Sequence, residues 1–496
     1  MNNLTGQTIN SVLNNRYTLT ESVSQGAQGV IYGENSGEFL IKILLEQNEN
    51  VQLFLENKLK ALYEIDFPTR FIKPLDILKF KIGNKSYVGY VMKRVKGHIV
   101  LNKLLIPSDN MTFGEWYNSY SGGLKRRLYL AYQIAQSFAL LHNNNMAYCD
   151  ISGNNILVAT NPQVNSVCMV DIDNVYTPGT LGNNIVGTIR YIAPEVTEKK
   201  MKPDVVTDDY SLAVILFELL RCGHPYVGDF VKDGSPEVEL AAYRGAFPYV
   251  DDENDNMNKA TDILPEYIIF NDTLKKLFRK TFVDGRKNRM SRATAKELAV
   301  ACLEASNALI RCSHCSAWYY PMKELKQSDG YFCPWCSEEA EKKVNSLKAY
   351  IKFGEIYPRF IDDTENLPDR IQYHKTFILQ DGNNFITANY IRRALTLDDY
   401  VPKTTKYEVE GNLKINFVVS YNEADNHCEM VSLSDSVIYI QRKGIPLMKI
   451  EKGNHFKLKD GDTLYFELLP KKISFNDVMT GNCSATTRRM AIIRLG

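Results

Sequence analysis

Hydrophobic and polar positions follow three successive patterns along the chain. From Tyr17 to about Phe80, short alternating segments such as GVIYGENSGEFLIKIL are separated by glycine turns, and one stretch of helical period, NVQLFLENKLKALYEI, interrupts them. After SYVGYVMKRVKG, apolar residues recur at helical spacing, as in LKRRLYLAYQIAQSFALLHN and DDYSLAVILFELLRC. Beyond Asn345 the alternation returns. The pattern predicts a small sheet with one helix, then a larger helical lobe, and finally a β-rich module.

Length and charge narrow the classes of function. A chain of 496 residues exceeds one ordinary core, so several domains are expected. The 59 Lys and Arg residues nearly balance the 58 Asp and Glu residues, and a net charge of +1 provides no general attraction for nucleic acid or an anionic membrane. No apolar stretch approaches the roughly 20 residues that span a bilayer, and MNNLTGQTINSV lacks the features of a secretory signal. We therefore expect a cytoplasmic protein that binds neither nucleic acid nor membrane.

Residues suited to phosphate chemistry occur at four places. In YCDISGNNIL, Asp150 precedes Asn155 by five positions, and the apolar strand VCMVDID leads to Asp171. Phosphoryl transfer needs an acid that accepts the proton of a hydroxyl, together with amide and carboxylate ligands for a divalent metal. Upstream, the glycine turn SQGAQGVIY can close over phosphates, and Lys42 follows on the next strand. The set predicts a site for phosphates and Mg²⁺.

With these motifs in this order, residues Tyr17 to Ala305 resemble the eukaryotic-type (Hanks-type) Ser/Thr protein kinases in a bacterial-like form. The resemblance implies an α+β, bilobal protein kinase fold that transfers the γ-phosphate of MgATP to Ser or Thr hydroxyls of protein substrates, its own included. An alternative is a nucleotide-binding pseudokinase scaffold that acts through its C-terminal modules. The retention of Asp150, for which a scaffold has no physical need, favours catalysis. A cognate phosphatase or a von Willebrand A protein would be a partner in a signalling setting.

The resemblance assigns a role to each position of the site. Asp150 is expected to be the catalytic aspartate, Asn155 and Asp171 the Mg²⁺ ligands, and Lys42 the lysine that holds the ATP phosphates. The full ATP-binding set adds the phosphate loop, the helix glutamate, the hinge with its gatekeeper, and the floor of the adenine site: Ser24, Gly26, Gly29, Ile31, Lys42, Glu56, Met92, Lys93, Val95 and Leu157.

Other matching positions are expected to support the site. Glu56 is taken as the helix glutamate that holds Lys42, with Glu49 as the alternative because the spacing from Lys42 to Glu56 is short. The stretch GTIRYIAPE is similar to the end of an activation segment. The remaining matches are its substrate-side threonine, its closing glutamate, the anchor of the catalytic loop, and the arginine expected to pair with that glutamate: Thr188, Glu195, Asp208 and Arg289.

Several positions depart from the family pattern, among them Ser24, which replaces the first glycine of the phosphate loop. Tyr148 and Cys149 replace the His and Arg that precede the catalytic aspartate, so activation by phosphorylation of the loop is not expected to be required. Ser152 replaces a lysine that stabilises the transferring group, which predicts low turnover or a substitute cation. Asp173 stands where a glycine is usual after Asp171 and Ile172. Its carboxylate either joins the metal shell or caps its own turn, and the cap is favoured.

Four of the ten cysteines form two CxxC pairs in RCSHCSAWYYPMKELKQSDGYFCPWC. Tetrahedral Zn²⁺ bound by four thiolates fits this spacing, and a redox pair is the less favoured alternative because no βαβ context surrounds it. His314 is expected to be a neighbour of the metal. The nearby aromatic residues are expected to form a small core rather than to stack on nucleic acid. The predicted structural Zn²⁺ ligands are Cys312, Cys315, Cys333 and Cys336.

These patterns divide the chain into an N-terminal tail (1–16), a kinase domain (17–305), a zinc ribbon (306–345) and a β-rich interaction module (346–496). The last module is expected to be a β-sandwich or barrel. Its second half, SVIYIQRKGIPLMKIEKGNHFKLKDGDTLYFEL, is similar to a forkhead-associated domain, without the upstream arginine and serine that grip phosphate. Isolated arginines are given no role as anion contacts: Arg392, Arg393 and Arg442.

Overall fold

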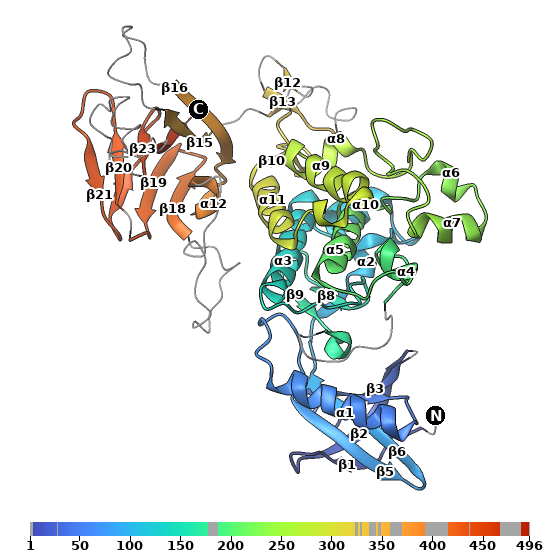
Figure 1. Cartoon of the computed structure of the whole chain (residues 1–496). Helices are drawn as coiled ribbons and strands as arrows, with labels where there is room; N and C mark the ends of the chain where they lie inside the picture. The colour runs from blue at the N-terminus through green and yellow to red at the C-terminus, as the bar shows by residue number, and fades with distance from the viewer. Residues whose placement is uncertain are drawn as a thin grey trace, which may run out of the picture. The chain divides into compact units, whose positions relative to one another are not determined.

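The computed structural model divides into two compact units, Met1–Cys302 and Leu303–Gly496 (Figure 1). It describes residues 3–26, 28–176, 187–322, 326–327, 330–336, 344–345, 349–357, 370–391, 415–435, 437–466 and 488–495. Arg392 and Arg393 lie outside the described residues. Among the helices of the described part, none combines the length and apolar character needed to cross a membrane.

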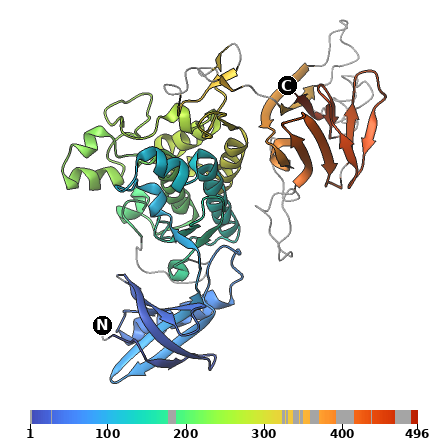
Figure 2. The ribbon, with the colours of Figure 1, turned by 180° about the vertical axis from the view of Figure 1, so that it is seen from behind.

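The first unit opens with an antiparallel six-stranded sheet in the order β1-β2-β3-β4-β6-β5, drawn in blue in Figures 1 and 2. One face buries Ile9, Val30 and Ile41, and the other buries Leu44 and Tyr90 beneath helix α1 (Glu49–Glu64). The side chain of the N-cap Asn48 accepts from the first free N–H groups of α1, which sets where the helix begins. The strands are β1 (Thr8–Asn10), β2 (Arg16–Gln25), β3 (Gly29–Glu34), β4 (Phe39–Leu44), β5 (Asp76–Ile82) and β6 (Lys85–Lys93).

A helical lobe follows, built around helices α3 (Gly123–His142) and α5 (Val205–Arg221), which pack against each other. Helix α5 is almost entirely buried, as expected for a central helix, and its buried residues include Asp208 and Glu218. Its start is set by a capping box between Asp204 and Thr207. The other helices are α2 (Asn102–Leu105), α4 (Pro194–Thr197), α6 (Asp229–Lys232), α7 (Pro236–Tyr243), α8 (Glu266–Ile269), α9 (Asp272–Arg279), α10 (Gly285–Lys287) and α11 (Ala295–Asn307), with π-helical turns η1 (Glu115–Tyr120) and η3 (Lys280–Asp284) and the 3₁₀ turn η4 (Arg289–Ser291).

A small three-stranded sheet carries the segments of interest. It runs in the order β7 (His98–Val100), β8 (Ile156–Ala159), β9 (Val167–Met169), and the 3₁₀ turn η2 (Ile172–Asn174) follows β9. Asn155 precedes β8 and Asp171 follows β9, and the N–H of Val170 donates to the carbonyl of Asn155 at 2.9 Å. The antiparallel pairing of β8 and β9 therefore brings the two predicted metal ligands to the same end of the sheet.

The second unit contains a β-sandwich. A six-stranded sheet, β16-β15-β24-β23-β20-β21, and a four-stranded sheet, β17-β18-β19-β22, bury one apolar core that includes Ile351, Phe353, Phe417, Met430 and Ile493. The strands and the one short helix are β15 (Ala349–Tyr357), β16 (Arg370–Ile378), β17 (Gly382–Thr387), α12 (Ala388–Ile391), β18 (Ile415–Asn422), β19 (His427–Ser432), β20 (Ile438–Gln441), β21 (Met448–Ile450), β22 (His455–Lys457), β23 (Thr463–Tyr465) and β24 (Arg488–Leu495).

A cysteine-rich segment precedes the sandwich in the same unit. It has the hairpin of β10 (Ile310–Arg311) and β11 (Trp318–Tyr319) and the small sheet of β12 (Lys326–Gln327), β13 (Gly330–Phe332) and β14 (Val344–Asn345). Its cysteines share a buried cluster with Ile378 of β16 and Tyr350 of β15, so the segment packs on the sandwich.

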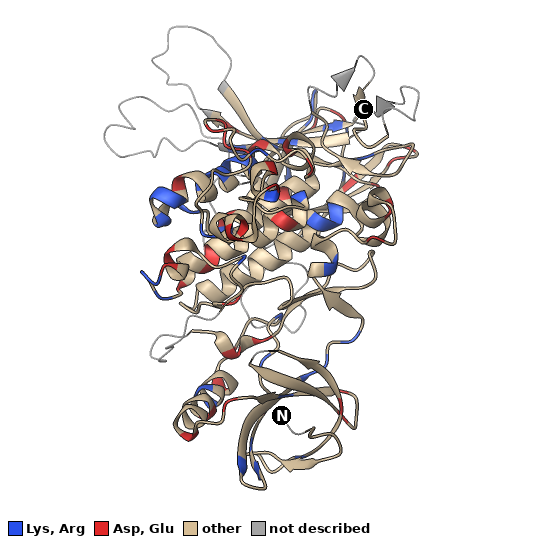
Figure 3. Cartoon of the chain, turned by 90° about the vertical axis from the view of Figure 1, so that its right-hand side faces the viewer, with Lys and Arg blue, Asp and Glu red and all other residues tan. Residues whose placement is uncertain are grey.

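The order of sheet, helical lobe and strand-rich C-terminal region confirms the predicted α+β class. Acidic and basic residues are interspersed over the helices of the first unit (Figure 3), in keeping with the near balance of charges in the sequence. Arg442 donates to both carboxylate oxygens of the buried Asp462, at 2.8 and 2.7 Å, and so has a structural role in the sandwich.

Candidate active site

Asp150 and Asn155 lie in one loop between helix α3 and strand β8. The Nδ2 of Asn155 donates to the carbonyl of Asp150 at 2.9 Å and to its Oδ2 at 3.0 Å, which fixes the direction of the carboxylate. The buried Asp208 of α5 accepts hydrogen bonds from the backbone N–H groups of Tyr148 and Cys149. Helix α5 therefore holds the loop of Asp150 in place. The placement of Asp208 agrees with the anchoring role expected from the sequence.

Thr188 closes the other side of Asp150. Its backbone N–H and its hydroxyl both donate to Asp150 Oδ1, at 3.2 and 3.4 Å. Asp150 Oδ1, the oxygen that would accept a proton, therefore faces Thr188. This threonine lies at the end of the predicted activation segment, where a substrate hydroxyl is expected. Burial raises the pKa of Asp150, and the hydrogen bonds from Asn155 and Thr188 only partly oppose this effect.

Lys42 reaches from strand β4 to the turn after strand β9. Its Nζ lies 2.5 Å from Asp171 Oδ1, and 3.0 and 3.1 Å from the two oxygens of Asp173. The side chain of Lys42 is 4% exposed. Burial alone would lower the pKa of Lys42, but the charges of Asp173 and Asp171 raise it above its ordinary value. The lysine is therefore held as a cation between the carboxylates of Asp171 and Asp173.

The backbone is in the left-handed region at two of these positions. Asp171 has a φ of 62° and Cys149 a φ of 70°, conformations that are uncommon for residues with a Cβ and that concentrate at functional sites. Tyr148 is fully buried, and its hydroxyl donates to the carbonyl of Val170, one residue before Asp171. Tyr148 thus joins the loop of Asp150 to the strand that carries Asp171.

Mg²⁺ fits the charge and the ligand types of this site. Burial and the neighbouring Asp173 raise the pKa of Asp171, which shows that the anions are crowded. The three carboxylates of Asp150, Asp171 and Asp173 act on one another, whereas the ammonium groups near them are Lys42 and Lys58, so negative charge is in excess. Hard divalent cations take carboxylate and amide oxygens, which Asp171 and Asn155 would supply.

The glycine turn lies between β2 and β3. The N–H of Gly26 donates to the carbonyl of Gly29 at 2.9 Å, which closes the turn. A Cβ on Gly29 would come within 2.8 Å of the carbonyl oxygen of Ile43, so the close approach of β3 to β4 requires glycine there. Ser24 is exposed at the end of β2, and Ile31 is the cross-strand neighbour of Lys42.

The predicted adenine-binding positions lie on strands β6 and β8. Met92 is buried in β6 beside Leu40 of β4, Lys93 is the exposed last residue of β6, and Val95 is half-buried just beyond it. Leu157 is half-buried in β8 and pairs with Val100 of β7.

Comparison with known proteins shows the family of the domain that contains Asp150, Asn155 and Asp171. Residues 82–301 match the family model described as protein kinase domain. The chain contains a protein kinase domain. Among curated proteins, it is 24% identical over 227 residues to a probable serine/threonine-protein kinase of Clostridium acetobutylicum, and 25% identical over 235 residues to another of Clostridium perfringens. It is also 24% identical over 263 residues to protein kinase YegI of Escherichia coli K12.

The three alignments cover 45%, 45% and 50% of this chain, and 32%, 31% and 38% of the respective relatives. The chain thus spans about a third of the length of these curated relatives. The family model begins at residue 82, after the glycine turn and Lys42. The assignment of the N-terminal strands to the kinase site therefore depends on the geometry described above.

The helix glutamate predicted from the sequence is corrected by the structure. Glu56 is buried in α1, but its carboxylate pairs with Lys60 at 2.7 Å and with Lys79 at 2.6 Å, away from Lys42. Glu49 is exposed at the first position of the helix. Lys58 of α1 is half-buried, and the negative charge of Asp173 acts on it.

Two arginines, rather than Arg289 alone, form the structural ion pair of the activation segment with Glu195. Arg292, not Arg289, makes the bidentate pair with Glu195, at 2.6 and 2.8 Å, and its side chain is 4% exposed. Arg289 lies 3.6 Å from Glu195 and pairs mainly with Asp204. The fork of a guanidinium matches a carboxylate best in the bidentate geometry, which Arg292 achieves.

Asp173 does not cap its own turn, the role favoured from the sequence. Its hydrogen-bond partners are Lys42 and the hydroxyl of Tyr90, the latter at 3.3 Å.

The four predicted zinc ligands come together in the second unit. The sulfur atoms of Cys312, Cys315, Cys333 and Cys336 all lie within 4.8 Å of one another, and two of the pairs are 3.7 Å apart. Four sulfurs at about 2.3 Å from a tetrahedral Zn²⁺ would be separated by roughly 3.8 Å, whereas a disulfide requires about 2.05 Å. The cluster fits zinc. Aromatic residues surround it as a small core: the hydroxyl of Tyr319 donates to Tyr331, and Nε1 of Trp335 donates to the carbonyl of Trp318.

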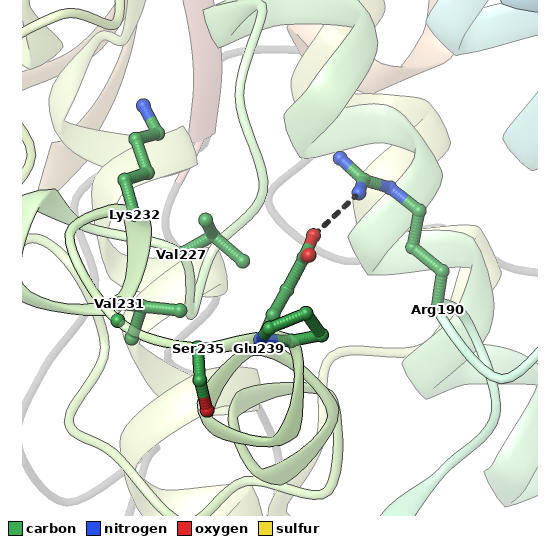
Figure 4. Close-up of a pocket in the computed structure, with 8 residues that line it drawn as sticks. Arg190, Val227, Val231, Lys232, Ser235 and Glu239 are labelled. Atoms are coloured by element: carbon green, nitrogen blue, oxygen red, sulfur yellow. Dashed lines mark ion pairs between the residues drawn. The ribbon is translucent and has the colours of Figure 1, made fainter.

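A cavity of about 390 Å³ lies beside helices α6 and α7 (Figure 4). Arg190 projects toward Glu239 across it, with 4.0 Å between the charged groups, and Arg190 also binds Glu218 at 2.5 Å. Lys232 pairs with Asp262. Arg190 and Lys232 are each paired with a carboxylate, so we assign no ligand to the cavity.

Proposed function

We propose that the chain is an ATP-dependent protein Ser/Thr kinase. The observation that carries the proposal is the meeting of Lys42, Asp171, Asn155 and Asp150 at one end of the small sheet, with the hydroxyl of Thr188 already hydrogen-bonded to Asp150. A cation, two metal ligands and a buried base are what transfer of a phosphoryl group requires.

In this mechanism Lys42 holds the phosphates of ATP, and the glycine turn covers them. Asp150 accepts the proton of a Ser or Thr hydroxyl while the hydroxyl oxygen bonds to the γ-phosphorus. The bond from that phosphorus to the bridging oxygen breaks, and ADP leaves with the electron pair. Burial raises the pKa of Asp150 toward the pH of the medium, and a general base is most effective when its pKa lies near that pH. Mg²⁺ on Asn155 and Asp171 would neutralise the charge of the phosphates.

Three further features belong to the proposal. Zn²⁺ on the four cysteines is structural, because four protein thiolates leave no open position for a water. A cytoplasmic location follows from the need to keep those thiolates reduced. Protein substrates carry the Ser or Thr, and a cognate phosphatase or von Willebrand A protein would complete a signalling set.

The test is incubation of the whole chain with γ-labelled ATP and Mg²⁺, alone and with a general acceptor protein. We expect label on Ser or Thr for the wild type, and a decrease of at least about 100-fold for Asp150→Asn and Asp171→Asn. Asp233→Asn, an exposed change in the same lobe, is the control and should retain activity. Tight binding of ATP without any transfer by the wild type would contradict the proposal and leave the nucleotide-binding scaffold.

A further inference from the structure

The partner of Lys42 comes from an unexpected element. In a protein kinase the lysine of this strand is held by a glutamate on the following helix, which leaves the aspartate after the metal strand free for Mg²⁺. Here α1 provides no carboxylate to Lys42, since Glu56 binds Lys60 and Lys79. Instead both oxygens of Asp173 accept from Lys42, at 3.0 and 3.1 Å.

Asp173 is built into its position. Its side chain is 9% exposed, and it accepts a hydrogen bond from the hydroxyl of Tyr90 at 3.3 Å. Tyr90 lies directly opposite Lys42 in the pairing of β4 and β6, so lysine and tyrosine approach Asp173 from adjacent strands of one rigid sheet. A buried carboxylate with two such donors is fixed in direction, which a freely turning surface carboxylate would not be.

Helix α1 supplies a positive charge to the same carboxylate. Helix α1 packs on the sheet through Leu55 and Leu59, and Leu62 is also buried. Lys58 lies between these leucines along the helix. Helix α1 packs against η2, the turn that contains Asp173, and the charges of Lys58 and Asp173 attract each other. The carboxylate of Asp173 thus attracts both Lys42 and Lys58.

The arrangement is a reversal of charges. In α1 the residue near the site is the cation Lys58 instead of a glutamate. In η2 the position that is usually glycine holds the anion Asp173. If Asp171 bound a metal, Asp173 would still be a carboxylate partner for Lys42.

We propose that Asp173 is the positioning residue that holds Lys42 for ATP, and that Lys58 links helix α1 to it in place of a helix glutamate. The inference rests on the proposed function, because it concerns how the nucleotide is held. It does not depend on transfer of phosphate, because nucleotide binding can be measured by itself.

The test is restoration of the usual arrangement by two substitutions. Asp173→Gly, Lys58→Glu and the double variant are compared with the wild type for the Kd of a fluorescent ATP analogue with Mg²⁺, for KM and kcat, and for Tm. We expect Asp173→Gly to weaken nucleotide binding about 10-fold or more, and Lys58→Glu to do the same by placing two carboxylates together. The double variant should recover at least about 10-fold over Asp173→Gly. Asn57→Glu, exposed on the same helix, is the control and should bind like the wild type.

The outcomes separate the two proposals. A double variant that binds no better than Asp173→Gly, with a Tm within a few degrees of the wild type, would overturn the positioning role. If Asp173→Gly loses its fold, Asp173→Asn keeps the volume and removes the charge, and unchanged binding in that variant would likewise overturn it. Nucleotide binding that follows the expected order in a chain that transfers no phosphate would support Asp173 while the kinase activity fails.

Discussion

His142 is a buried histidine with two acidic partners. At the end of α3, its Nε2 lies 3.3 Å from Asp208 and its Nδ1 3.4 Å from Asp209, and its side chain is 9% exposed. Burial alone would lower the pKa of His142, but the two carboxylates raise it to about 9. Asp208 also anchors the loop of Asp150, so the imidazolium of His142 helps to hold the carboxylate on which that loop depends.

The raised pKa of His142 predicts a pH dependence of stability. A histidine with a folded pKa above its unfolded value stabilises the fold fully below about pH 6.5, and the contribution is lost as the pH rises through about 9. We expect His142→Gln to reduce the free energy of unfolding by about 3 kcal/mol at pH 6, and by much less at pH 9.5. Urea denaturation at both pH values measures this. His455→Gln, whose side chain is 65% exposed, is the control, and an equal effect of His142→Gln at both pH values would contradict the prediction.

Individual residues differ in how far the sequence predicts them. Asp150 and Asn155 belong to one short loop, so their spacing along the chain nearly determines their spacing in space. The partner of Lys42 depends instead on the rotation of α1, where one residue is a turn of about 100°. Glu56, the predicted partner, and Lys58 are two residues apart in α1, so their side chains leave the helix in different directions. Of the two, Lys58 is the one on which the charge of Asp173 acts. Nothing local in the sequence settles that rotation.

At the scale of elements, the pair of Arg292 and Glu195 joins helix α4 to the segment before α11. Burial alone would raise the pKa of Glu195, but the hydrogen bonds and charge of Arg292 lower it below its usual value. Its stabilising contribution is therefore present above about pH 4.5 and is lost as the pH falls further. The sequence places Arg289 and Arg292 three residues apart, and only the packing of the two elements decides which one reaches the carboxylate.

We expect Arg292→Met to destabilise the fold by about 3 kcal/mol, because it leaves the carboxylate of Glu195 poorly compensated. Arg289→Met should cost about 1 kcal/mol or less, since its side chain is 20% exposed and its contact with Glu195 is long. Chemical denaturation of the two variants at pH 7 compares them directly. Equal losses in the two variants would mean that Arg289 shares the role.

Whole-molecule organisation was predictable where a pattern repeats along the chain. Alternating strands predicted the sandwich, and the CxxC spacing predicted the cysteine cluster, because both signals are local. The packing of that cluster against Tyr350 and Ile378 of the sandwich is long-range, and no local pattern reports it. The cysteine cluster therefore belongs to the second unit, together with the sandwich on which it packs.

Because each unit has its own core, two ligands should act on different unfolding transitions of the intact chain. MgATP at 100 times its Kd stabilises the unit that binds it by about 2.7 kcal/mol, so the transition of Met1–Cys302 should rise by about 5 °C. Removal of Zn²⁺ with a chelator should lower the transition of Leu303–Gly496, since the cysteines share a buried cluster with the sandwich. Scanning calorimetry resolves both effects, and Cys333→Ser should reproduce the effect of the chelator. A chelator that lowers the nucleotide-sensitive transition to the same extent would show instead that zinc stabilises the kinase domain itself.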